Sequence, residues 1–450
     1  MLHVLREAVG HEHVLVDDDL TAAYRMDWTG RWTGRCRAVV RPADTAQVSA
    51  VVQVCAAHGA PVVPQGGNTG LVGGAVPVVG SVVLSTLRLD RIGEVDDATG
   101  QVTAGAGATI EAVQQAARRA GWRYAVDLAA RGSATVGGSI ATNAGGHHVI
   151  RYGMTRRHVV GVEAVMADGS VVSHLGGLLK DNTGYDLGGL LCGSEGTLAV
   201  VTAARLALVA PDSNTAVALV GFDALDHAVA SIGALRRGLP GVEAIEVMFD
   251  DGMRAVAEHR GARPPFESCP VVLLVEAAGP GDPVGALADA LGRLDGVVDS
   301  AVADDAPRRA ELWLWRDAHT ETISAVGSTP PHKLDVTVPL AAWPEFVDRV
   351  RGLAATRPDA RLWLFGHAGD GNLHVNVTGL GPDDDSLDTE IVGLVAELSG
   401  SISAEHGIGR AKRAWLHLNR SPAELAAFRS IKDALDPAGL LNPEVLLPDP

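Results

Sequence analysis

The chain has 450 residues, which is too long for one ordinary hydrophobic core, so two or three domains are expected. Apolar residues make up 47% of the sequence and charged residues only 20%, a balance typical of a well-packed globular protein. Acidic residues outnumber basic ones by 54 to 37, and this negative balance argues against nucleic-acid binding because the phosphates would be repelled.

The cysteines and the N-terminus indicate a reducing compartment. No CxxC spacing is present, so neither a zinc knuckle nor a disulfide framework is predicted. The N-terminal stretch MLHVLREAVG lacks a basic region followed by an apolar run, and no uninterrupted apolar segment reaches membrane-spanning length. We therefore expect a cytoplasmic protein without a transmembrane segment.

The first glycine-rich stretch follows a predicted helix over residues 45–58 and a short strand. This stretch, PQGGNTGLVGGAVP at residues 64–77, contains five glycines that interrupt regular structure and leave backbone N–H groups to face an anion. It matches neither GxGxxG nor a Walker loop, so the usual nicotinamide and ATP fingerprints are absent here. A phosphate cradle and an ordinary glycine turn both remain open.

A second region of small residues begins after two predicted strands, residues 82–87 and 101–107, and a helix over 109–120 that Thr109 would cap. This region, RGSATVGGSIATNAGG at residues 131–146, has little side-chain bulk, which lets a backbone approach a large flat ligand closely. A flexible linker is the alternative. Interleaved valine and isoleucine, and a predicted strand over residues 159–172, argue against it.

Glu195 lies between Ser194 and Gly196 in the next stretch, residues 180–202, and is either an ordinary turn carboxylate or a cofactor contact. From about Pro211 the pattern changes to longer helices and strands. Their order of helix, strand, strand and helix resembles half of a ferredoxin-like sandwich, so a second domain is predicted to begin there.

A predicted helix over residues 311–324 carries Arg316 and Thr320, four residues apart and therefore on one face. Lys333 stands at the entrance of the strand that follows. Two such cations can bind a substrate carboxylate, Arg316 through its planar fork and Lys333 as a point charge. Solvated surface cations are the alternative.

The stretch GHAGDGNLHVN, residues 366–376, is predicted to form a tight loop up to Gly371 and then a short strand. His374 and Asn376 share one face of that strand, whereas His367 needs the loop to fold it back. With Glu405 from SAEHGIG, residues 403–409, the chain offers two imidazoles and one carboxylate. That set, with a fourth position open, is expected of catalytic zinc; loop histidines without a metal are the alternative.

Seven collinear stretches resemble the FAD-linked 2-hydroxy acid dehydrogenases of the vanillyl-alcohol-oxidase flavin superfamily. They run from about residue 35 to the C-terminus, which makes the resemblance specific. The stretches are PQGGNTGLVGGAVP, GGSIATNAGG, RYGMTRRHVVGVEAVMADGSVV, KDNTGYDLGGLLCGSEGTL, GHAGDGNLHVN, SAEHGIG and DPAGLLNP.

The resemblance implies an α+β fold with three parts. Residues 1–210 would form an FAD-binding domain of the vanillyl-alcohol-oxidase type, preceded by a helical lead-in. Residues 211–400 would form a ferredoxin-like substrate domain. Residues 401–450 would form a short C-terminal helical segment that completes the active site.

The resemblance also implies a set of FAD contacts. Relatives that attach the flavin covalently often use a histidine in the first glycine loop, and Asn68 occupies that position here, so noncovalent FAD is expected. The implied cofactor-binding residues are Gly66, Gly67, Asn68, Thr69, Gly70, Ser133, Gly137, Gly138, Ser139, Thr142, Asn143, Glu195 and Asn442.

By the same resemblance, His367, His374 and Glu405 would hold Zn²⁺, and His406 would be the catalytic base. The zinc would bind the substrate hydroxyl and carboxylate, His406 would take the hydroxyl proton, and the hydrogen on the α-carbon would leave as hydride to flavin N5.

Relatives that act on D-2-hydroxyglutarate look like this chain at three positions that would hold the distal carboxylate, Arg316, Thr320 and Lys333. Asn376 is expected to contact the substrate as well. Because relatives that act on D-lactate usually lack the lysine, Lys333 favours oxidation of D-2-hydroxyglutarate to 2-oxoglutarate. The alternatives are D-lactate or a broader range of D-2-hydroxy acids, and, more distantly, a zinc hydrolase. Electrons would pass to a separate acceptor such as an electron-transfer flavoprotein or a quinone, and a homodimer is compatible with this interpretation.

Overall fold

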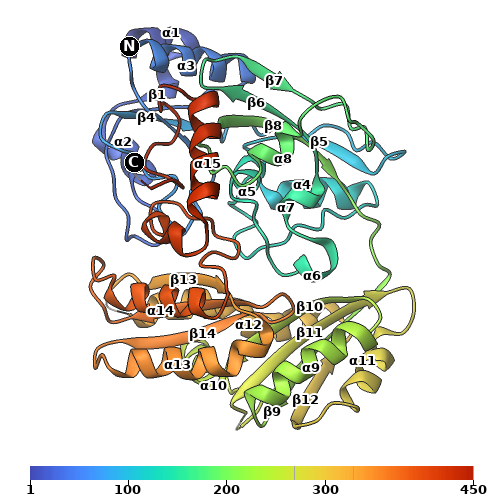
Figure 1. Cartoon of the computed structure of the whole chain (residues 1–450). Helices are drawn as coiled ribbons and strands as arrows, with labels where there is room; N and C mark the ends of the chain where they lie inside the picture. The colour runs from blue at the N-terminus through green and yellow to red at the C-terminus, as the bar shows by residue number, and fades with distance from the viewer. Residues whose placement is uncertain (268, 328, 449–450) are drawn as a thin grey trace. The chain divides into compact units, whose positions relative to one another are not determined.

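The computed structural model describes residues 1–267, 269–327 and 329–448, which form two compact units (Figure 1). The first unit contains Met1–Gly146, Gly153–Pro211 and the chain from Glu405 onward. The second contains His147–Tyr152 and Asp212–Ala404. Helices and sheets occur in both units, which confirms the predicted α+β class.

One sheet of the first unit has four strands in the order β1-β2-β4-β3, with β2, β4 and β3 parallel. Its strands are β1 (Val14–Leu15), β2 (Cys36–Val40), β3 (Val62–Gln65) and β4 (Ser81–Ser85). The helices among them are α1 (Leu2–Val9), η1 (His11–His13), α2 (Asp18–Arg25) and α3 (Thr45–Ala57). The predicted helix over 45–58 is therefore confirmed, and the Asp44 carboxylate caps it by accepting from the Gln47 N–H at 2.8 Å.

The other sheet of the first unit is antiparallel, in the order β5-β8-β6-β7. It consists of β5 (Gln101–Gly105), β6 (Val159–Met166), β7 (Val171–Ser173) and β8 (Ala199–Ala207), with α4 (Ile110–Arg119), α5 (Val136–Thr142), α7 (Thr155–His158) and α8 (Leu187–Leu191). Thr109 caps α4 as predicted. The single strand predicted over 159–172 is wrong. Gly169 has a φ of +82° and the Asp168 carboxylate accepts from the Ser170 N–H, so the chain turns there and forms a hairpin.

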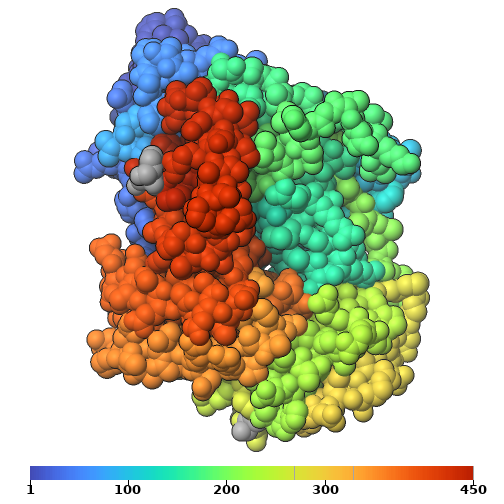
Figure 2. All heavy atoms as spheres, in the orientation of Figure 1, coloured from blue at the N-terminus to red at the C-terminus, as the bar shows by residue number. Residues whose placement is uncertain are grey.

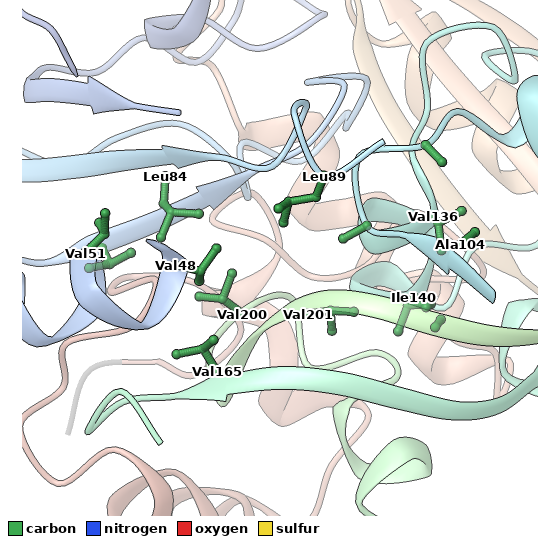
Figure 3. Close-up of a cluster of buried hydrophobic side chains, with 14 of the residues drawn as sticks. Val48, Val51, Leu84, Leu89, Ala104, Val136, Ile140, Val165, Val200 and Val201 are labelled. Carbon is green, nitrogen blue, oxygen red and sulfur yellow. The ribbon is translucent and has the colours of Figure 1, made fainter. Parts of the chain in front are cut away.

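Aliphatic side chains from both sheets pack into one core in the first unit (Figure 3). Val48 and Val51 come from α3, Leu84 from β4, and Val165 and Val200 from the antiparallel sheet. All five are buried, so the core fixes the two sheets against α3.

The C-terminal chain belongs to the first unit. It contains η3 (Arg413–Leu418) and α15 (Pro422–Leu435), and Ser421 and Glu424 form a capping box at the start of α15. Lys432 on this helix donates to the Thr197 carbonyl at 2.7 Å. Figure 2 shows this segment, in red, lying along the surface of the unit between the blue N-terminal part and the green part.

The second unit is built on a seven-stranded antiparallel sheet in the order β12-β9-β11-β10-β14-β15-β13. Its strands are β9 (Asn214–Phe222), β10 (Val242–Phe249), β11 (Val271–Gly279), β12 (Val297–Ala303), β13 (His332–Thr337), β14 (Arg361–His367) and β15 (Asn372–Thr378). Its helices are α6 (Val149–Tyr152), α9 (Leu225–Gly238), α10 (Asp250–Arg260), α11 (Pro283–Leu291), α12 (Ala306–Val326), η2 (Leu340–Ala342), α13 (Trp343–Ala355) and α14 (Ser386–Glu397).

This sheet contains one ferredoxin-like motif and most of a second. The elements β9-α9-β10-β11-α11-β12 follow the β-α-β-β-α-β order, with α10 inserted after β10. The elements β13-α13-β14-β15-α14 repeat that order without the last strand. The two motifs join where β10 pairs with β14.

The predicted glycine loop is shorter than expected. His367 is the last residue of β14 and pairs with Asn372, the first residue of β15, so only residues 368–371 form the loop. The hairpin places His367 and His374 on adjacent strands with side chains on the same face of the sheet. Helix α12 lies on that face, because its Trp315 packs in a core cluster with Met248 of β10.

Within the described residues, no helix is both long enough and apolar enough to cross a membrane.

Candidate active site

Polar side chains gather on one face of β13, β14 and β15 in the second unit. Three rows of paired residues cross these strands, and residues paired directly project from the same face of a sheet. The rows are Lys333–Asn376–Trp363, Asp335–His374–Phe365 and Thr337–Asn372–His367. Predicted residues His367, His374, Asn376 and Lys333 are thus brought together on one surface.

The two histidines form a close pair with their ring centroids 5.1 Å apart and their planes at 80°. Each has a carboxylate at Nδ1: Glu246 lies 2.8 Å from His367, and Asp335 lies 3.5 Å from His374. Histidines that bind metals usually donate their other ring N–H to such a partner, which fixes the tautomer. The pair therefore fits a metal-binding role, and Asp335 is an additional carboxylate that the sequence did not predict.

Glu246 on β10 is completely buried, and both its oxygens are hydrogen-bonded. Burial alone would raise the pKa of Glu246, but His367 and Arg316 outweigh it and lower the pKa to about 2. Glu246 is therefore ionised beside the histidine pair.

Arg316 and Lys333 are both buried, so the alternative that they are solvated surface cations is wrong. Arg316 donates from Nε to Glu246 at 2.7 Å, and its guanidinium lies 4.8 Å from the centre of the Phe365 ring. Burial lowers the pKa of Lys333 to about 8. Thr320 is half-buried one turn after Arg316 on α12, the helix that the sequence predicted.

Asn376 is 2% exposed, and its Nδ2 has no hydrogen-bond partner among the described residues. A buried amide without a partner costs about 1–3 kcal/mol, so such a donor fits the oxygen of a bound molecule. This observation agrees with the predicted substrate contact.

A second polar network in this unit was not predicted. The His148 ring is 3.1 Å from Glu276, and the Trp313 indole donates to the other oxygen of Glu276 at 2.6 Å. The neighbouring His147 ring lies 5.8 Å from that of His367. No spacing in the sequence relates residues 147–152 to the sheet, so only the fold shows that they belong there.

In the first unit, the two glycine-rich regions pack directly against each other. A Cβ on Gly66 would lie 2.3 Å from Thr135 Oγ1, and a Cβ on Gly67 would lie 1.8 Å from the Ser133 carbonyl oxygen. A Cβ on Gly137 would lie 2.7 Å from the Ala106 Cβ, whereas a Cβ on Gly70 would meet nothing within 4 Å. In the first region, Gly66 and Gly67 therefore allow close packing, whereas the backbone at Gly70 is open to the approach of a ligand.

Four predicted cofactor residues adopt a left-handed backbone, although none is glycine. They are Asn68, Asn143, Glu195 and Asn442, with φ between +42° and +53°. Such conformations persist where surrounding contacts impose them, and they cluster at functional sites. The Asn68 amide donates to the Met26 carbonyl at 2.8 Å, which helps to hold that backbone.

Glu195 joins three segments of the first unit. Its buried carboxylate accepts from the backbone N–H groups of Ile408 at 2.8 Å and Gly409 at 2.7 Å, and burial raises its pKa. The Asn442 amide donates to the Glu195 carbonyl at 2.6 Å, while Asn442 Oδ1 is buried without a partner among the described residues. Glu195 thus holds the loop that follows Glu405 and His406; its contact with a cofactor stays a prediction.

The candidate ligand Glu405 and candidate base His406 lie in the same loop. The Glu405 carboxylate accepts from the Gly146 N–H at 2.8 Å, and its other oxygen lies 3.6 Å from His406 Nε2. Both side chains are half-buried.

Comparison with known proteins identifies the family. Residues 36–174 match the FAD binding domain model, and residues 211–446 match the model of the C-terminal domain of FAD linked oxidases. The chain is 40% identical to a D-2-hydroxyglutarate dehydrogenase of Xanthomonas citri pv. viticola, over 93% of this chain and 91% of that protein. It is 36% identical to the mitochondrial D-2-hydroxyglutarate dehydrogenase of Bos taurus, over 98% of this chain and 82% of that protein. The chain belongs to the FAD-linked D-2-hydroxy acid dehydrogenase family.

Solved structures confirm the vanillyl-alcohol-oxidase type of fold for this family member. The chain superimposes on p-cresol methylhydroxylase with a TM-score of 0.80 at 16% identity, covering 98% of this chain and 95% of that one. For 4-ethylphenol oxidase from Gulosibacter chungangensis the TM-score is 0.79 at 18% identity, with coverage of 100% and 97%. At these identities the likeness concerns the fold alone.

FAD is the cofactor of this dehydrogenase family member, and the first unit fits it. Gly70 is open to a ligand, and Asn442 Oδ1 is a buried acceptor without a partner among the described residues. Because the matched regions are those of FAD-linked enzymes, the zinc hydrolase alternative loses its basis.

Proposed function

We propose that this chain oxidises D-2-hydroxyglutarate to 2-oxoglutarate with noncovalent FAD and a zinc ion. The observation that carries the proposal is the burial of Arg316 and Lys333 on the sheet face that also bears His374 and Asn376. Two desolvated cations favour a substrate with two carboxylates over one with a single carboxylate. The names of the relatives at 40% and 36% identity support the same substrate.

The substrate is bound at its two ends. Arg316, Thr320 and Lys333 hold the distal carboxylate, the arginine through paired N–H donors and the lysine through its ammonium. Asn376 donates from Nδ2 to a substrate oxygen, which satisfies an otherwise unpartnered buried amide. These contacts orient the C2 hydrogen without changing charge during the reaction.

The metal ligands are His367, His374 and Glu405, a set of two imidazoles and one carboxylate typical of catalytic zinc. When bound, zinc polarises the C2 hydroxyl and lowers its pKa. His406 then accepts the hydroxyl proton in its neutral form, the role that imidazole commonly takes near pH 7.

The flavin is held noncovalently, because Asn68 stands where covalent relatives often carry a histidine. When bound, FAD supplies N5 as the acceptor of the hydride from C2. The residues that would hold it are those of the first glycine loop, the predicted residues between Ser133 and Asn143, Glu195 and Asn442. The electrons then leave for a separate acceptor, an electron-transfer flavoprotein or a quinone.

The test is anaerobic mixing of the purified holoprotein with the D and L forms of 2-hydroxyglutarate and lactate, followed by flavin absorbance. D-2-Hydroxyglutarate should bleach the flavin, both L acids should not, and D-lactate should act at much higher concentration only. In Lys333→Ala the response to D-2-hydroxyglutarate should weaken while that to D-lactate is kept.

Arg349→Ala serves as the control, because Arg349 is a half-buried cation of α13 that pairs with Glu397. If D-lactate bleaches the wild-type flavin as well as the diacid does, and Lys333→Ala changes neither response, the substrate assignment is wrong.

A further inference from the structure

We propose that Glu246 is a positioning residue that holds the zinc ligand His367 and the substrate-binding Arg316 with one carboxylate. Metal affinity and recognition of the distal carboxylate would then depend on the same buried charge. The inference rests on the proposed function, since it takes His367 and Arg316 in the roles given there.

The carboxylate is shared evenly between the two partners. Oε1 accepts from His367 Nδ1 at 2.8 Å, and Oε2 accepts from Arg316 Nε at 2.7 Å. Glu246 and His367 are paired directly between β10 and β14, at the junction of the two ferredoxin-like motifs. Strands on both sides hold the Glu246 backbone, so its carboxylate has little freedom to move.

For His367, the contact determines which ring nitrogen carries the proton. A carboxylate accepts only, so the proton of the neutral ring is at Nδ1 and the lone pair is at Nε2. The neighbouring guanidinium agrees with this tautomer, because Arg316 Nη2 lies 3.4 Å from Nε2 and a guanidinium can only donate. A lone pair at Nε2 is what zinc requires of a neutral imidazole.

For Arg316, the contact determines the plane of the guanidinium. Glu246 holds Nε on one edge, and the Phe365 ring lies against the group at 4.8 Å. The donors on the remaining edge then point in a fixed direction, which a bidentate carboxylate contact needs.

Asp335 supports His374 more loosely. Its Oδ1 is 3.5 Å from His374 Nδ1, and it also accepts from the Asn372 amide at 2.8 Å and the Ala404 N–H at 3.1 Å. The Glu246 carboxylate, in contrast, joins a proposed metal ligand to a proposed substrate cation through two short hydrogen bonds.

The decisive variant is Glu246→Gln, which keeps the size of the side chain but replaces one acceptor oxygen with a donor amide. The amide then faces either the His367 N–H or the Arg316 N–H, both of which donate. We expect zinc affinity to fall about 10–100-fold. We also expect weaker binding of glutarate with excess zinc, whereas butyrate binding should change little. Zinc affinity is measured by competition with a chromogenic chelator on the FAD-loaded protein, and acid binding by the change in the flavin spectrum.

Glu276→Gln is the matched control, because Glu276 is also a buried carboxylate of this sheet bound to a histidine and touches neither His367 nor Arg316. If both variants lose thermal stability alike and neither changes zinc affinity, Glu246 is only structural and the inference is overturned.

Two further measurements test the inference if the Glu246→Gln variant does not fold. Glu246→Asp keeps the charge but is shorter by one methylene and cannot reach both partners, so zinc or glutarate affinity should still fall; retention of both overturns the inference. In metal-free wild-type protein labelled with ¹⁵N-histidine, His367 should carry its proton at Nδ1, and a proton at Nε2 alone would overturn it.

Zinc binding and flavin reduction of the wild-type protein show whether this inference or the proposed function has failed. If it binds zinc and is reduced by D-2-hydroxyglutarate while Glu246→Gln matches it in zinc and glutarate affinity, only the inference is wrong. If the wild-type protein binds no zinc, the proposed function fails and the inference fails with it.

Discussion

Lys333 and Asn376 are directly opposite each other on β13 and β15, so a cation and an amide donor lie side by side on one sheet face. Both residues are almost fully buried. Burial makes the unpartnered Asn376 amide costly to leave without an acceptor, and it also lowers the pKa of Lys333. The pair should therefore bind acids in a pH-dependent way.

The first prediction concerns that pH dependence. The pKa of Lys333 is lowered to about 8 by burial, and only its protonated form attracts a carboxylate. As the pH rises through about 8, the ammonium is lost and the KM for D-2-hydroxyglutarate should rise. The KM for D-lactate, which has no distal carboxylate, should stay nearly constant. Steady-state assays between pH 6.5 and 9.5 measure both.

Lys333→Met is the control for this prediction, since methionine keeps an unbranched side chain without a charge. Its KM for the diacid should be about 10–100-fold higher at pH 7, as expected for a charge-assisted contact of about 1.5–3 kcal/mol. The rise above pH 8 should be absent in the variant. A diacid KM that is flat with pH in the wild-type protein would contradict the role of Lys333.

The second prediction concerns metal removal. Treatment with a strong chelator should slow substrate-dependent flavin reduction about 100-fold or more while the flavin stays bound, because zinc supplies several kcal/mol of charge stabilisation. Added zinc should restore the rate. His374→Ala should bind little zinc, whereas His417→Ala, an exposed residue of η3, should behave as wild type. Full activity in metal-free protein would refute the roles of His367, His374 and Glu405.

Local signals in the sequence predicted much of the fold. The helix over residues 45–58 and the helix capped at Thr109 were visible because caps and periodicity depend on neighbouring residues. The turn at Gly169 was missed because strand-forming residues on both sides masked it. The partial repetition of the ferredoxin-like motif was also invisible, since it is a repetition of topology and not of residues.

In the site, too, some residues could be predicted from local sequence and others only from the fold. Asp335 shares the parity of Lys333 along β13, so alternation alone could have placed it on the polar face. Glu246 was not predicted, although a charge within the apolar run IEVMF could have indicated a buried group with a partner. Which partners it has could not be predicted, because His367 and Arg316 lie far away in the sequence and meet Glu246 only through the pairing of β10 with β14 and the packing of α12.

The third prediction separates two roles of glycine in the first glycine loop. Gly67→Ala should destabilise the apoprotein by about 1–3 kcal/mol, because its Cβ would lie 1.8 Å from the Ser133 carbonyl oxygen. Gly70→Ala should leave apoprotein stability unchanged, since nothing lies within 4 Å, but should weaken FAD binding if the cofactor passes there. Thermal unfolding of apoprotein and FAD titration by fluorescence measure the two effects. Equal FAD affinity in Gly70→Ala and wild type would remove Gly70 from the cofactor site.

The last prediction concerns Glu195, whose buried carboxylate accepts two backbone N–H groups just after His406. In Glu195→Gln one acceptor oxygen becomes a donor that faces an N–H, so the loop of residues 407–409 should loosen. If Glu195 positions this loop, the rate of flavin reduction should fall about tenfold or more, since a buried charge-assisted hydrogen bond is worth about 1.5–3 kcal/mol, while FAD affinity is kept.

The matched control for this variant is Glu163→Gln, because Glu163 accepts from Thr45 and Thr202 in the same unit and does not touch the loop. It should leave the rate of flavin reduction unchanged. Loss of FAD from a folded Glu195→Gln protein would instead favour a direct cofactor contact, the other role that the sequence left open for this residue. Stopped-flow reduction rates and FAD dissociation constants for both variants decide between loop positioning and flavin contact.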